Sequence, residues 1–142
     1  MSDIKDSVAA SVSPMRNLEQ IRAKNAYAWK DKIGTGNEGG RAVAKKVPAQ
    51  IMQNGFLGAL AFAIENKGSG YENVFRAILE HLEAAGRSYG LHCNDLQKFL
   101  DELCSKDADV LRTVTAESLA YLNYLRRFVK SEKEDGAGEG EG

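Results

Sequence analysis

The chain has 142 residues, of which 43% are hydrophobic and 27% are charged, and its formal net charge is −1. This length suits one domain with a packed core, and this composition is ordinary for a globular protein. Two cysteines are too few for a disulfide framework. No apolar run approaches the roughly 18–20 residues that cross a bilayer, and no signal peptide is recognisable, so we expect a cytoplasmic protein.

The small net charge conceals a segregation of charge along the chain. Residues 16–46 carry net +5 and residues 110–131 carry net +3, whereas residues 71–109 and residues 132–142 each carry net −4. A near-neutral total is therefore compatible with a locally basic face that attracts polyanions.

The pattern between the two ends is helical almost throughout. Residues 1–14 are rich in Ser, Ala and Asp, and residues 132–142 are acidic and glycine-rich, so we expect both segments to be disordered. Residues 15–131 form the predicted helical domain. We expect no strand, because the sequence shows no sustained alternation of period two. The predicted fold class is all-α, a compact single-domain bundle of about six or seven helices.

The first predicted helix has an apolar stripe from Leu18 to Ile33. It ends in "GTGNEGG", where Gly34, Gly36 and Gly39 have the G-x-G-x-x-G spacing of dinucleotide-binding loops. Such a loop requires a strand before it and a helix after it, and here a helix precedes it. We therefore interpret the segment as an interhelical loop. A passing RNA phosphate can approach the helix start that follows, but we expect no bound dinucleotide.

The second predicted helix starts near Arg41 and contains Pro48, which predicts a kink or a restart near Lys45. The Asn54-Gly55 step predicts a helix end or a tight bend, and a helix rich in small residues follows it.

Three further helices are predicted in the second half of the chain. Ser69 with Glu72 has the spacing of a capping box, and the helix that follows is expected to stop at Gly86. Asn94 is predicted to cap a short helix, and Thr115 is predicted to cap the last one.

We expect no active site, no metal and no cofactor. A four-ligand zinc site would need all of the histidines and cysteines in the chain, which are His81, His92, Cys93 and Cys104. These lack the short paired spacings of zinc sites, and incidental residues are the better interpretation. No nucleophile motif such as G-x-S-x-G is present, and the acidic residues between Asp101 and Asp109 are typical of a solvated face.

Basic residues are more informative, because they gather on the polar faces of three predicted helices, where phosphate contacts are possible. We select eight candidates: Arg16 and Lys30 on the first helix, Arg41, Lys45 and Lys46 on the second, and Arg126, Arg127 and Lys130 on the last. The three on the last helix project within roughly a 100° arc opposite its apolar side. A plain solvated face is the alternative interpretation of the same pattern.

Three stretches carry a family resemblance: "AKNAYAW" in the first helix, "KKVPAQIMQNGFLGALAF" at residues 45–62, and "TAESLAYLNYLRRFVK" at residues 115–130. Together they resemble the small α-helical subunit of the type III-B CRISPR effector, the Cmr complex. The middle motif is matched by Lys46, Pro48, Ala49, Asn54, Gly55, Ala59, Leu60, Ala61 and Phe62, and the final one by Leu125, Arg126, Arg127 and Phe128. The resemblance spans roughly residues 16–130. The chain departs from the family pattern at residues 56–58 and at Tyr124.

The resemblance implies a non-catalytic protein whose copies stack along an RNA-guided ribonucleoprotein in antiviral defence. The eight basic candidates then become RNA-binding residues. Expected partners are guide RNA, single-stranded target RNA, other Cmr subunits and further copies of the chain, with the acidic residues 71–109 facing the basic face of the next copy. No membrane and no small-molecule ligand are expected. The alternative is a helical protein–protein adaptor that binds no nucleic acid, and an enzyme is a distant third.

Overall fold

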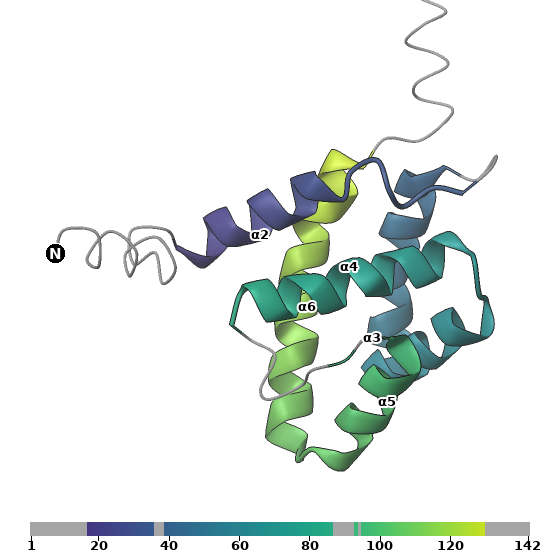
Figure 1. Cartoon of the computed structure of the whole chain (residues 1–142), viewed down its shortest axis with the longest axis vertical. Coiled ribbons are helices and arrows are strands. Elements are labelled where there is room, and N and C mark those ends of the chain that lie inside the picture. Colours follow the sequence, from purple (N-terminus) through teal and green to yellow (C-terminus); the bar gives the residue numbers. More distant parts are fainter. Residues whose placement is uncertain (1–16, 36–38, 87–92, 94, 130–142) are drawn as a thin grey trace, which may run out of the picture.

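The computed structural model describes residues 17–35, 39–86, 93 and 95–129, which form a bundle of helices with no β-strand among them (Figure 1). The helices are α2 (Leu18–Ala28), α3 (Gly40–Glu65), α4 (Gly70–Ala84), α5 (Leu96–Ser105) and α6 (Ala108–Phe128). The all-α fold class is therefore confirmed over the described residues. The predicted segments 1–14 and 132–142 lie outside them.

The helix count of six or seven is wrong, because the described residues form five helices. Two of the predicted helix boundaries, at Pro48 and at Thr115, are not helix boundaries in the structure. α3 continues without a break through Pro48, and α6 begins at Ala108, seven residues before the predicted cap at Thr115. The Thr115 hydroxyl instead donates a hydrogen bond to the carbonyl of Leu111 within the same helix, at 2.7 Å.

α3 bends at Gly55 and not at Pro48. Gly55 has φ 83° and ψ 160°, a conformation that only glycine adopts without strain. The bend predicted at the Asn54-Gly55 step is thereby confirmed. Phe56 follows it directly and is buried, so the change of direction brings this ring into the core.

Side-chain caps fix where three of the helices begin. Asn17 and Gln20 form a reciprocal capping box at α2, with both hydrogen bonds at 2.9 Å. Asp95 accepts from the backbone N–H of Lys98 at the start of α5, and Asn94, the predicted cap, lies outside the described residues. Asp107 takes the same role at α6.

The predicted capping box at α4 is only half formed. Ser69 occupies the N-cap position, but its side chain makes no capping hydrogen bond. Glu72 instead accepts from the backbone N–H of Gly68 at 2.8 Å, and this hydrogen bond is the main reason that the pKa of Glu72 is lowered.

One hydrophobic core joins all five helices, and an aromatic trio lies within it. The ring of Phe56 on α3 contacts the rings of Phe75 on α4 and Phe99 on α5, edge to face, with centroids 5.5 and 6.0 Å apart. α4 packs on α3 and α6, as Figure 1 shows, and α2 packs mainly on the upper half of α6.

α3 is the one helix among the described residues that is long and apolar enough to cross a membrane, by length and composition alone. The sequence analysis did not anticipate such a segment. In the bundle, however, α3 contributes nine buried residues and contacts α4, α5 and α6. Its apolar side chains thus have partners within the protein, and its length and composition are weak evidence for a span.

α2 ends at Ala28, earlier than the predicted apolar stripe, and a turn then carries the chain to Ile33. Ile33 is nevertheless completely buried, and its carbonyl accepts a hydrogen bond from the Asn73 side chain at 3.0 Å. The stripe therefore identified a core residue correctly but assigned it to the wrong element.

Gly40 lies at a close approach between the start of α3 and the end of α6. A Cβ atom at this position would lie 2.8 Å from Cγ1 of Val129 and 2.9 Å from the backbone nitrogen of Gly34. Both distances are too short for non-bonded atoms, so only glycine fits between these two segments.

We expect the Gly40→Ala variant to lower the free energy of unfolding by about 1–3 kcal/mol, because the added methyl group overpacks this junction. Urea unfolding monitored by circular dichroism measures the change. Gly58→Ala is the matched control, since its Cβ would contact only Cβ of Asn54, at 3.3 Å. Equal effects at the two positions would show that the junction is not tightly packed.

Candidate nucleic-acid interface

Six of the eight predicted RNA-binding residues are described: Lys30, Arg41, Lys45, Lys46, Arg126 and Arg127. Arg16 and Lys130 lie outside the described residues. The end of α2, the start of α3 and the end of α6 lie near one another (Figure 1). Four of the six residues lie at these helix ends: Lys30 just after α2, Arg41 in the first turn of α3, and Arg126 and Arg127 in the last turn of α6. We call this set, Lys30, Arg41, Arg126 and Arg127, the basic end.

Direct contacts hold the three helix ends together. The guanidinium of Arg41 donates a hydrogen bond from Nε to the carbonyl oxygen of Val129, at 3.1 Å. The rings of Tyr27 and Phe128 pack edge to face with centroids 5.7 Å apart. α2, α3 and α6 are thus fixed to one another at the basic end, although Lys30 and Arg127 are almost a hundred positions apart in the sequence.

Lys30 is held beside the last turn of α2. Its ammonium group is 2.7 Å from the carboxylate of Asp31 and 4.8 Å from the centroid of the Tyr27 ring. The hydrogen bond to Asp31 is the main cause that raises the pKa of Lys30. Asp31 is itself exposed, so water screens this ion pair and its contribution to stability is small.

The two arginines of α6 are the most accessible part of the basic end. Arg127 is exposed, and Arg126 is partly exposed with a long hydrogen bond of 3.4 Å from Nε to Asn123. Lys45 and Lys46 are exposed on the next turn of α3, where Val43, Ala44 and Val47 face the core. They continue the positive charge along α3 beyond the basic end.

Lys32 is a candidate that the sequence analysis did not select. It is exposed, and its ammonium group lies 5.3 Å from the centroid of the Trp29 ring. Its membership of the basic segment 16–46 was the only signal in the sequence that could have identified it.

A polar network centred on two buried side chains, His81 and Glu117, links three helices. Arg22 on α2 forms two hydrogen bonds with the carboxylate of Glu117 on α6, both at 2.8 Å. Nε2 of His81 on α4 is also 2.8 Å from Glu117, and Nδ1 of the same ring is 2.8 Å from the Asn25 amide on α2. Tyr121 stacks on the imidazole ring at 4.3 Å. We call Arg22, Asn25, His81 and Glu117 the buried network.

The donors and acceptors in the buried network match one another. When the Asn25 amide donates to Nδ1 of His81, the ring carries its proton on Nε2 and donates it to Glu117. Burial alone would raise the pKa of Glu117, but the hydrogen bonds from Arg22 and His81 more than offset it and hold this pKa at about 2. Glu117 is therefore an ionised carboxylate whose negative charge is paired with Arg22 and hydrogen-bonded by His81 inside the protein.

This network was not predicted from the sequence. His81 was interpreted as an incidental residue, and no role was predicted for Glu117, which is the single acidic residue between 110 and 131. His81 is in fact completely buried with both ring nitrogens engaged. Arg22 and Asn25, three positions apart, lie on one side of α2, a spacing that could have indicated a shared partner.

The glycine-rich segment has the context of an interhelical connection. α2 precedes it, and Gly39 forms the N-cap of α3 with no side-chain hydrogen bond. Residues 36–38 lie outside the described part of the chain. Within that part, no group of three His, Cys, Asp or Glu residues is arranged to hold a metal ion. Burial raises the pKa of the Cys93 thiol, which disfavours the reactive thiolate.

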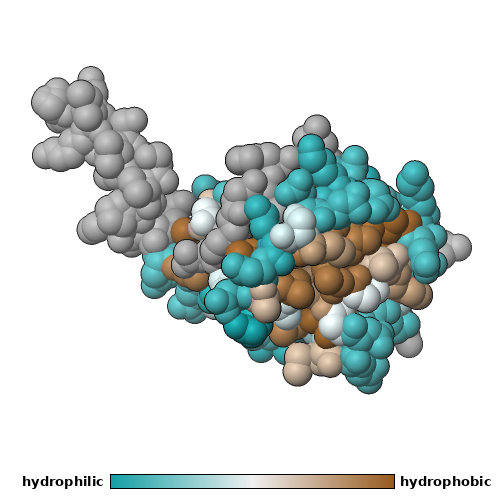
Figure 2. All heavy atoms as spheres, turned by 90° about the horizontal axis from the view of Figure 1, so that it is seen from below, coloured by the Kyte–Doolittle hydropathy of each residue, from teal (hydrophilic) through white to brown (hydrophobic). Residues whose placement is uncertain are grey.

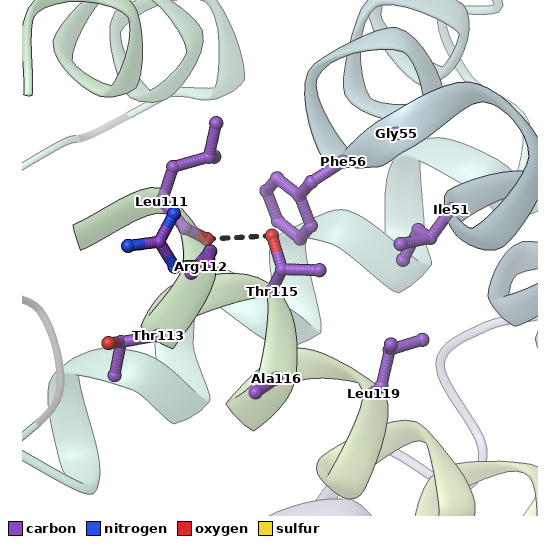
Figure 3. Close-up of a pocket in the computed structure, with 9 residues that line it drawn as sticks. All are labelled: Ile51, Gly55, Phe56, Leu111, Arg112, Thr113, Thr115, Ala116 and Leu119. Carbon is purple, nitrogen blue, oxygen red and sulfur yellow. Dashed lines mark hydrogen bonds between the residues drawn. The ribbon is translucent and has the colours of Figure 1, made fainter. Parts of the chain in front are cut away.

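A second surface feature is an open apolar groove of about 700 Å³ between α3 and α6. Ile51 and Phe56 line one wall, and Leu111, Ala116 and Leu119 line the other (Figure 3). The underside of the bundle also exposes an area of hydrophobic residues that hydrophilic residues border (Figure 2). Such surfaces are typical of contacts with other proteins.

The fold and these surfaces define the chain as a small all-α bundle with a basic end and an apolar groove. Comparison with models of protein families gives the family: the one described as CRISPR-associated protein (Cas_Cmr5) matches residues 18–132. The chain therefore belongs to the Cmr5 family of CRISPR-associated proteins, which confirms the resemblance found in the sequence. This membership is consistent with the small subunit of a type III-B Cmr complex and implies association with other Cmr subunits. Searches of curated proteins and of solved structures gave no match.

We expect the Glu117→Gln variant to lower the free energy of unfolding on the order of 3 kcal/mol at neutral pH, because it leaves Arg22 without its counter-charge. The folded pKa of about 2 lies below the ordinary value of 4.5. The stabilisation is therefore complete above about pH 4.5 and is lost as the pH falls toward 2. Urea unfolding at a series of pH values measures both effects.

Asp109→Asn is the matched control, because it removes an exposed carboxylate of the same helix that pairs with Arg112. We expect this change to have little effect on stability. If Glu117→Gln and the wild-type protein lose stability in parallel between pH 4.5 and pH 2, the assigned role of Glu117 is wrong.

Proposed function

We propose that the chain is the non-catalytic small subunit of an RNA-guided type III-B CRISPR ribonucleoprotein, acting in antiviral defence in the cytoplasm. In this proposal the basic end binds the backbones of guide RNA and single-stranded target RNA. Lys45 and Lys46 extend the contact along α3. Family membership supports the type of complex, and the surface described above supports the type of ligand.

The observation that carries the proposal is that three helix ends bearing cations are in contact. Lys30, Arg41 and Arg127 lie at the ends of three separate elements. The Tyr27–Phe128 ring contact joins α2 to α6, and the hydrogen bond from Arg41 to Val129 joins α3 to the end of α6. Each phosphate that a cation neutralises releases counterions, so a cluster of this kind binds polyanions strongly at low salt. Phosphate contacts carry no sequence information, which suits a subunit that must accept any guide.

A non-catalytic role agrees with the burial of His81 and Cys93. His81 is completely buried between Asn25 and Glu117 and cannot reach a substrate without disrupting the bundle. Cys93 is buried and its pKa is raised. The proposal therefore assigns RNA cleavage to other subunits of the complex.

The apolar groove between α3 and α6 favours a second candidate function, that of a helical adaptor that binds only proteins. In the proposal preferred here, the groove and the acidic residues 71–109 instead serve contacts with neighbouring Cmr subunits and with further copies of the chain, while the basic end serves RNA. The two candidate functions differ in one measurable property: the small subunit is expected to bind RNA, and the adaptor is not.

We expect the double variant Arg126→Glu, Arg127→Glu to lower affinity for single-stranded RNA by about tenfold or more at low salt, because two phosphate contacts become repulsive. Fluorescence anisotropy with a labelled oligouridine measures the affinity, both for the full chain and for the assembled complex. Arg112→Glu is the control, since Arg112 is an exposed arginine near the opposite end of α6 that pairs with Asp109.

The outcomes separate the two candidates. RNA affinity that falls in the double variant but not in the control supports the proposed function. Loss of assembly with other Cmr subunits, with unchanged RNA affinity, supports the adaptor. Unchanged affinity together with unchanged assembly contradicts both roles for this end of α6.

A further inference from the structure

The described residues include three large hydrophobic side chains that are exposed: Tyr27 at 59%, Met52 at 73% and Phe62 at 39%. Phe62 and Met52 lie on α3, away from the basic end. Tyr27 differs from both because it lies within the basic end, beside Lys30 and against Phe128. An exposed aromatic ring beside cations is suited to a ligand that has both a planar ring and a negatively charged group.

The ring of Tyr27 is held in place although it is exposed. Its edge-to-face contact with Phe128 on α6 has an interplanar angle of 84°, and the ammonium group of Lys30 lies over one face of the ring, 4.8 Å from its centroid. A base that stacks on the ring would use the face opposite Lys30. Asn25 and Arg22, which precede it on α2, are fixed by the buried network. A ring that is already positioned loses little conformational entropy when it binds a second ring.

An acidic peptide would satisfy the cations, but it would match the Tyr27 ring only where it also carried an aromatic side chain. An unpaired nucleotide supplies both parts, a base with a π-face and a phosphate with negative charge. A base in a duplex is already stacked on its neighbours and cannot use the ring. The combination therefore favours a single-stranded nucleic acid.

We infer that Tyr27 is a stacking platform for an unpaired base of the bound RNA, with Lys30 contacting the adjacent phosphate. This inference rests on the proposed function, because it specifies the ligand of the basic end. It adds a contact that is not electrostatic, and it makes the site selective for single-stranded over double-stranded RNA.

Stacking and phosphate contacts differ in their dependence on salt. Loss of a cation–phosphate contact lowers the affinity and also reduces the slope of log K against log salt by about one, because fewer counterions are released. Loss of a stacked base lowers the affinity at every salt concentration and leaves the slope unchanged, because no counterion is involved. Tyr27→Ala and Lys30→Ala are thus expected to have distinguishable signatures.

The experiment measures anisotropy of a labelled oligouridine, and of the same strand paired with oligoadenine, over a series of salt concentrations with the full chain. We expect Tyr27→Ala to weaken single-strand binding by about tenfold with no change in slope, and to leave duplex binding unchanged. Tyr27→Phe keeps the ring and should retain the wild-type affinity. Phe62→Ala is the matched control, because it removes an exposed aromatic side chain outside the basic end.

Circular dichroism confirms that each variant is folded. If Tyr27→Ala is destabilised, Tyr27→Leu replaces it, because leucine keeps an apolar side chain against Phe128 but has no ring on which a base can stack. The inference is overturned if Tyr27→Ala binds the single strand as the wild-type protein does, or if it weakens duplex and single strand equally. If Lys30→Ala and the Arg126, Arg127 variants lower affinity while Tyr27→Ala does not, the stacking contact is wrong but the proposed function stands. If the wild-type chain does not bind RNA at low salt, both are wrong.

Discussion

The ion pair between Arg22 and Glu117 is the interaction on which the basic end depends. α2 has one buried residue, Ala26, so hydrophobic contact alone holds this helix weakly. The carboxylate of Glu117 accepts hydrogen bonds from Arg22 and from His81, and His81 in turn engages Asn25. Because breaking such a buried pair leaves an uncompensated charge, the network fixes the position of α2 on α4 and α6.

The position of α2 then determines where its part of the basic end lies. Tyr27 and Lys30 follow the buried network by less than two turns, and Tyr27 reaches Phe128 across the helix boundary. The start of α3 is brought to the same place by the absence of a side chain at Gly40, which lets it contact Val129. The buried network and the close contact at Gly40 thus bring together three helix ends, each of which carries basic residues. The apolar groove lies between α3 and α6 and involves no residue of α2, so it is separate from the basic end. The proposed protein contacts and the proposed RNA contacts therefore use different surfaces.

The sequence predicted what depends on local periodicity and missed what depends on pairing between distant residues. The all-α class, the bend at Gly55 and the exposed positions of Lys45, Lys46 and Arg127 all follow from spacing or from residue type at one position. The continuity of α3 through Pro48 was missed, because burial of the surrounding helix outweighs the local preference of proline. Glu117 and Arg22 are 95 positions apart, and nothing local marks them as partners. The stripe that includes Ile33 shows the same limit, since periodicity identified a core residue but could not identify the turn that places it.

The most direct test of this account is the RNA affinity of the Glu117→Gln variant, measured while it is folded, together with the emission of Trp29. Trp29 is the only tryptophan, follows α2 directly and packs against the core, so it reports whether α2 is in place. The substitution removes a negative charge, and long-range electrostatics alone would therefore strengthen RNA binding. Our account predicts the opposite: a shifted Trp29 emission and weaker RNA binding, because α2 no longer completes the basic end. Unchanged or tighter RNA binding in a folded variant, with or without a shift in Trp29 emission, would contradict it.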